Sequence, residues 1–113
     1  MLSPREVNAL WPRGVGRFLR LARKTFGLTQ KEFAEILSRQ GPNRYCDSYF
    51  SKLENGASGG GLDFWLQMAN WLNLKLSTVF MLLELMADEE ALSEERNATV
   101  TIVLESRRTD KAK

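Results

Sequence analysis

The side chains best suited to recognising another molecule gather on one short predicted helix, which runs from about residue 46 or 47 to residue 55. Phe50 and Leu53 face inward in that helix, so its outward side chains are those of Asp47, Ser48, Ser51, Lys52 and Asn55. Hydroxyl and amide groups donate and accept hydrogen bonds, an ammonium group donates them and a carboxylate accepts them. The row therefore predicts recognition through hydrogen bonds rather than catalysis.

The composition excludes the commonest kinds of catalytic centre. Histidine, the most frequent general base and metal ligand, is absent, and Cys46 is the only cysteine. The sequence contains no Gly-x-Gly-x-x-Gly, Walker-type or Gly-x-Ser-x-Gly motif. Gly59-Gly60-Gly61 lacks a preceding strand and a phosphate-binding lysine, so we interpret it as a flexible connection. We expect a protein that is not an enzyme and that holds no cofactor and no metal.

Length and hydropathy predict a single soluble domain. The chain has 113 residues, 43% of them apolar, which is enough for one hydrophobic core. No apolar run reaches the roughly 18–20 residues that span a bilayer, and the N-terminal residues lack the apolar centre of a signal peptide. One cysteine cannot form an internal disulfide. We therefore expect a cytoplasmic protein.

The charge is uneven along the chain, although the formal net charge is only +2. Residues 1–60 hold ten basic and five acidic residues, a balance of +5, whereas residues 61–113 hold six basic and nine acidic residues, a balance of −3. A basic first half suits a surface that faces phosphate groups. An ordinary solvated surface explains the same imbalance, and charge alone does not separate the two interpretations.

Helical patterns organise the first half of the chain around this row. Ser3-Pro4-Arg5-Glu6 predicts a short helix to about Leu10, and Pro12 either ends that helix or starts the next. Residues 13–26 combine an apolar stripe with a basic one, and Gly27 follows as a stop. Thr29-Gln30-Lys31-Glu32 is a second capping box, which opens a helix to about residue 38 or 39.

The C-terminal half predicts two further helices and then an extension. After a helix over 62–72, the helix over 77–86 is apolar on two sides and needs two partners, one of which could be a second subunit. Residues 84–95 carry six acidic side chains and no basic one. Residues 99–105 are rich in β-branched side chains and predict a strand that would pair with its copy in a second chain. We therefore divide the chain into a domain over 1–86 and an extension over 87–113 for dimerisation or partner binding.

Two stretches match known motifs in order and register. Leu28-Thr29-Gln30-Lys31-Glu32-Phe33-Ala34 fits the pattern Leu-Thr-Gln-x-Glu-Leu-Ala, and Phe50-Ser51-Lys52-Leu53-Glu54-Asn55-Gly56 fits Ile-Ser-x-Ile-Glu-Asn-Gly. On these motifs, residues 17–80 resemble the phage-repressor-like helix-turn-helix family, also called the Cro/CI or XRE type. The expected fold is all-α: a five-helix repressor-like helix-turn-helix domain, with a short N-terminal helix before it and the C-terminal β-strand extension after it.

The resemblance implies a DNA-binding role for both motif helices. The second would enter the major groove and read bases through Asp47, Ser48, Ser51 and Lys52, although we favour helix capping for Asp47. The first would place Gln30 against a phosphate. The other candidate phosphate contacts are Arg17, Lys31, Arg39, Arg44 and Asn55, the last of which could instead cap the helix C-terminus. We expect Glu54 to form a structural hydrogen bond or ion pair, because an unpaired carboxylate is repelled by phosphates.

The sequence departs from the family pattern in the turn at 38–45, which is several residues longer. The added residues bring Arg39 and Arg44 near the presumed DNA face. They could add DNA contacts, but we favour a tolerated surface insertion. Cys46, beside this turn, could be a redox-sensitive thiol, although we favour a small buried side chain.

Together these features predict a sequence-specific, double-stranded-DNA-binding transcriptional regulator that acts as a homodimeric repressor. The alternative is an antitoxin of a toxin–antitoxin pair, which would regulate its own operator and neutralise a toxin with the C-terminal segment. In that case the C-terminal tail would have a protein partner. No membrane association is expected.

Overall fold

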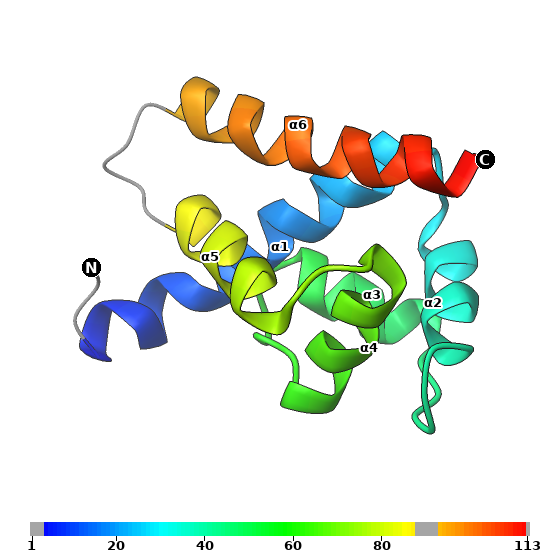
Figure 1. Ribbon diagram of the computed structural model, residues 1–113. Helices are drawn as coiled ribbons and strands as arrows, with labels where there is room; N and C mark the ends of the chain where they lie inside the picture. The colour runs from blue at the N-terminus through cyan, green and yellow to red at the C-terminus, as the bar shows by residue number, and fades with distance from the viewer. Residues whose placement is uncertain (1–3, 88–92, 113) are drawn as a thin grey trace.

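The protein is all-α in the computed structural model, which describes residues 4–87 and 93–112 (Figure 1). Within these ranges the chain forms six helices and no strand, whereas the expected fold is a five-helix domain with a separate short N-terminal helix and a C-terminal strand. In chain order they are α1 (Pro4–Phe26), α2 (Gln30–Ser38), α3 (Asp47–Glu54), α4 (Leu62–Leu72), α5 (Leu76–Ala87) and α6 (Ser93–Ala112).

The predicted break near Leu10 is wrong, because α1 is one continuous helix with Pro12 inside it. A proline in a helix interior removes one backbone hydrogen bond and costs about 3 kcal/mol. Contacts on both sides of Pro12 offset this cost. Trp11 packs edge-on against Phe80 of α5 at 5.9 Å between ring centroids. A Cβ at Gly14 would lie 2.7 Å from the Cβ of Ala87, so glycine is what permits this close approach of α1 to α5.

The apolar stripes predicted from the sequence form one core. Val15, Phe18, Leu19 and Ala22 of α1 are fully buried, as the helical period predicts. Aromatic contacts join the elements: Phe18 meets Trp65 of α4 with ring centroids 6.1 Å apart. This core fixes the positions of α2, α3 and α4 relative to α1.

The predicted strand at 99–105 is wrong, because these residues lie within α6. A strand would place Val100, Ile102 and Leu104 on one face. Instead Val100 and Leu104 are fully buried, while Ile102 is 69% exposed, which is the spacing of a helix. β-Propensity differences amount to only about 1 kcal/mol. Burial of two aliphatic side chains against the domain outweighs them.

α5 and α6 pack against each other within the chain. Figure 1 shows α6 crossing one side of the molecule, where it contacts α1 and α5. α5 has α1 on its other side, so the two partners that its apolar faces require are both intramolecular. The rationale for dimerisation through a paired strand is therefore lost. The division at residue 87 stays a prediction, and Val100 and Leu104 share the core of the first 86 residues.

Among the described residues, none of the helices is both long enough and apolar enough to cross a membrane.

Candidate nucleic-acid interface

The N-terminus of α2 is fixed by the predicted capping box. The backbone N–H of Glu32 donates to the Thr29 hydroxyl at 3.1 Å, and the Thr29 N–H donates to the Glu32 carboxylate at 2.9 Å. The hydrogen bond from the Thr29 backbone lowers the pKa of Glu32. Because these bonds define the first turn of α2, they also fix the directions in which the side chains of Gln30 and Lys31 project from the helix.

Aromatic rings hold α3 against α2. Phe33 of α2 and Phe50 of α3 lie 5.0 Å apart between ring centroids, and Phe50 also meets Phe64 of α4 at 5.5 Å. α3 ends before Gly56, whose φ of +75° is a conformation that a side chain disfavours, and the N–H of Ala57 donates to the carbonyl of Lys52 at 3.0 Å. The two motif helices therefore form a fixed pair.

The outward row predicted on α3 lies at the surface. Asp47, Ser48, Lys52 and Asn55 are exposed, and Ser51 is half-buried. Asn55 is already engaged, since it accepts a hydrogen bond from the Arg20 guanidinium at 3.2 Å and donates to the Ser51 hydroxyl at 3.4 Å. The row thus offers three exposed side chains, at positions 47, 48 and 52, and a linked Ser51–Asn55 pair.

The start of α3 differs from the expectation. Cys46, and not Asp47, is the N-cap residue, and its side chain makes no capping hydrogen bond. Asp47 lies one position later, in the first turn, where a carboxylate interacts favourably with the helix dipole. The burial expected for Cys46 is also wrong, because this thiol is exposed. Its sulfur lies 3.0 Å from the Ser48 hydroxyl, and that hydrogen bond lowers the pKa of Cys46.

The ion pair expected for Glu54 is confirmed. Arg23 of α1 donates to both carboxylate oxygens of Glu54, from Nε at 2.9 Å and from Nη2 at 3.0 Å. The Glu54 side chain is only 2% exposed, so its charge is withdrawn from the surface of α3. Sequence reasoning missed Arg23 because it lies outside the basic stripe. Its position directly after Ala22, at the edge of the buried stripe, is the one feature of the sequence that indicates a side chain close to the core.

The long turn (residues 39–46) is bound to the domain rather than loosely inserted. Gln67 of α4 is buried and donates to the carbonyl of Leu37 at 2.7 Å and to that of Asn43 at 3.2 Å. Its Oε1 accepts from the N–H of Asn43 at 3.0 Å. The hydroxyl of Ser38 accepts from the N–H of Tyr45 at 2.8 Å. Sequence reasoning did not identify Gln67 or Ser38 as supports of the turn. The only indication in the sequence is that each polar side chain stands at a helical position whose spacing predicts burial.

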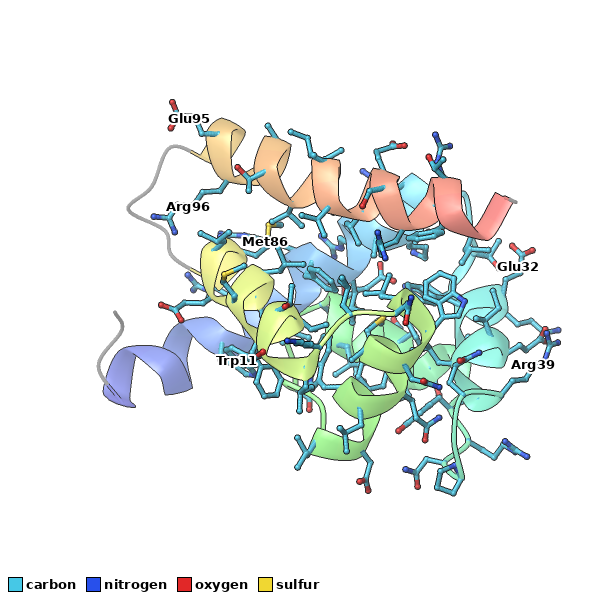
Figure 2. All side chains as sticks on the ribbon, viewed as in Figure 1. Trp11, Glu32, Arg39, Met86, Glu95 and Arg96 are labelled. Atoms are coloured by element: carbon cyan, nitrogen blue, oxygen red, sulfur yellow. The ribbon has the colours of Figure 1, made fainter. Side chains whose placement is uncertain are left out.

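The predicted phosphate contacts fall into separate groups. Gln30 and Lys31 lie at the start of α2, whereas Arg39 and Arg44 are exposed and line one pocket of about 520 Å³ beside the α2 C-terminus. Arg17 does not join them, because it donates to the carbonyl of Met86 at 3.1 Å, at the end of α5. Figure 2 shows Arg39 and the acidic Glu95 at opposite ends of the molecule, so the carboxylate of Glu95 is far from the cation of Arg39.

Comparisons of the chain with protein families, with curated proteins and with solved structures found no match.

Proposed function

We propose that this protein is a sequence-specific, double-stranded-DNA-binding transcriptional regulator that acts as a dimeric repressor. The observation that carries the proposal is the outward row of hydrogen-bonding side chains on α3, in which Asp47, Ser48 and Lys52 are exposed and Ser51 is half-buried. α2 holds this row in place through the Phe33–Phe50 contact. Helix-turn-helix proteins bind DNA with such a pair of helices, of which the second faces outward and lies in the major groove.

The dimensions of α3 suit the major groove. Its 8 residues span about 12 Å at a rise of about 1.5 Å per residue, which fits a groove about 12 Å wide. Lys52 can donate to guanine O6 and N7, and the hydroxyls of Ser48 and Ser51 can donate or accept. Asp47 can accept from cytosine N4. Arg23 supports this role because it neutralises Glu54, the other acid of this helix.

The surrounding groups would position α3 through the DNA backbone. Gln30 and Lys31 at the N-terminus of α2 suit one phosphate, since backbone N–H groups and the helix dipole also favour an anion there. Arg39 and Arg44, in the turn after the α2 C-terminus, suit another. Two copies of the chain would read half-sites about 34 Å apart, and occupation of a promoter would repress it.

The antitoxin alternative requires a C-terminal segment that is available to a second protein. α6 instead buries Val100 and Leu104 in the core, and Arg96 donates to the carbonyl of Leu85 at 3.3 Å. A toxin would have to bind the outer face of α6 or displace the helix. We therefore prefer the regulator.

Selection of binding sites from random double-stranded DNA, followed by footprinting, tests the proposal. Ser51→Ala with Lys52→Ala should relax or abolish the base preference while the helical circular dichroism spectrum is kept. Gln30→Ala should weaken binding to all sequences alike. Arg96→Ala is the control, because it removes one positive charge at the end of the molecule away from Arg39 (Figure 2) and should leave the footprint unchanged. An unaltered footprint in the Ser51/Lys52 variant contradicts the assignment of α3.

A further inference from the structure

The side chain of Gln67 forms the inner support of the long turn. It is 4% exposed and reaches from α4 to the end of α2, through the carbonyl of Leu37, and to the middle of the long turn, through both backbone groups of Asn43. Its amide therefore uses both hydrogens and its oxygen on the backbone of other segments. An apolar side chain of the same size would fill the space without fixing the turn.

A second set of bonds continues this support to the outer surface. The hydroxyl of Ser38 donates to the carbonyl of Ala34 at 2.8 Å and accepts from the N–H of Tyr45. The Arg44 guanidinium donates to the carbonyl of Ser38, at the C-terminus of α2. This bond holds the cation of Arg44 beside the end of the helix, and so restricts where its remaining donors point.

The two turn arginines share one pocket as a result. Arg39 and Arg44 line it together with Glu35, Ser38, Gly41 and Tyr45. Two guanidinium groups present planar sets of N–H donors, which match the oxygens of a phosphate. Glu35 contributes an opposing negative charge, so the pocket favours a phosphate only while both cations are in place.

We infer that Gln67 is a positioning residue, which holds the long turn so that Arg39 and Arg44 together bind one phosphate of the DNA backbone. This inference rests on the proposed DNA-binding function and adds to it a second anchoring point beyond the α2 N-terminus. The longer turn then serves to place α3 in the groove through a contact between α2 and α3 in the chain. It is a contacting element and not a tolerated insertion.

A mutant cycle on the full-length protein tests the inference, with the selected DNA site as the probe and affinity measured against salt concentration. Arg39→Ala with Arg44→Ala should lower the affinity about tenfold or more and reduce the salt slope by about 1. Gln67→Met should reproduce most of that loss. It should have no further effect in the double-arginine background, because its action passes through those side chains.

Two controls separate positioning from a loss of stability. Val100→Ala truncates a buried side chain of α6 and should lower the melting temperature while the salt slope stays unchanged. Gly41→Ala disturbs the same contact from the turn side and leaves Gln67 itself in place, because its Cβ would lie 2.8 Å from Cδ of Gln67, so that the turn or this side chain must shift. Like Gln67→Met, Gly41→Ala should lower both the affinity and the salt slope. It therefore keeps the inference testable if Gln67→Met fails to fold. Gly61→Ala, whose Cβ would meet nothing within 4 Å, is its matched control.

The outcomes distinguish the two proposals. A wild-type protein that selects no DNA overturns the function and the positioning role together. A wild-type protein that binds, with Gln67→Met and Gly41→Ala no different in salt slope from Val100→Ala and Gly61→Ala, overturns the positioning role alone. Additive losses from Gln67→Met and the arginine pair also contradict it.

Discussion

The long turn and α6 are attached to the same domain by opposite means. The turn is held by hydrogen bonds of Gln67 and Ser38 to its backbone, with Arg39 and Arg44 exposed outside. α6 is held chiefly by the burial of Val100 and Leu104. Hydrogen bonds are directional, whereas apolar burial is not. The difference teaches that polar contacts fix the geometry of the long turn, while apolar contacts of α6 supply stability.

Among the polar and apolar contacts of the domain, the largest loss of stability is expected from the buried Arg23–Glu54 ion pair behind α3. Arg23→Met leaves Glu54 buried without its main partner, since Arg20 approaches it only to 3.8 Å. Loss of one member of a buried pair costs about 3–5 kcal/mol, so we expect a destabilisation of about 3 kcal/mol in urea unfolding. Arg108→Ala breaks the exposed Arg108–Glu105 pair and should cost at most about 1 kcal/mol. Equal costs for the two variants contradict the burial of Glu54.

Truncation of α6 should have a similar or slightly smaller effect on stability and none on binding geometry. Leu104→Ala creates a cavity and should cost about 2–4 kcal/mol, measured by chemical unfolding. Ile102→Ala should change stability by less than about 0.5 kcal/mol, because this side chain is 69% exposed. A strand would place both residues on one face. Similar losses for the two variants would therefore sink the helical assignment.

The smallest effect concerns the local cap of α2. Thr29→Ala removes the capping hydrogen bond and should destabilise the protein by about 1 kcal/mol. The pKa of Glu32 is lower in the folded state than its ordinary value of 4.5, so its contribution is present above that pH and is lost as the pH falls below it. Melting curves from pH 7 to 3 should show that Glu32→Gln loses less stability on acidification than the wild type. Parallel curves contradict the capping role.

Much of the α2–α3 pair could be predicted from the sequence. The capping box at Thr29, the glycine stop at Gly56 and the inward positions Phe50 and Leu53 all lie where the sequence indicates. These signals act within one or two helical turns, so neighbouring residues alone carry them. The outward row of α3 follows from the same periodicity. The support of that row does not, because Arg23 and Gln67 reach α3 and the long turn from segments distant in the chain.

The sequence by itself determined the all-helical core, the boundaries of α2 and the residues that α3 turns outward, because local hydrogen bonds and apolar periodicity encode them. Tertiary structure decided the rest. It kept α1 continuous through Pro12, turned a β-branched segment into α6 and exposed Cys46. For α1 and α6, local preferences of a few kcal/mol or less compete with packing against elements far away in the chain, and only the folded arrangement shows which is larger.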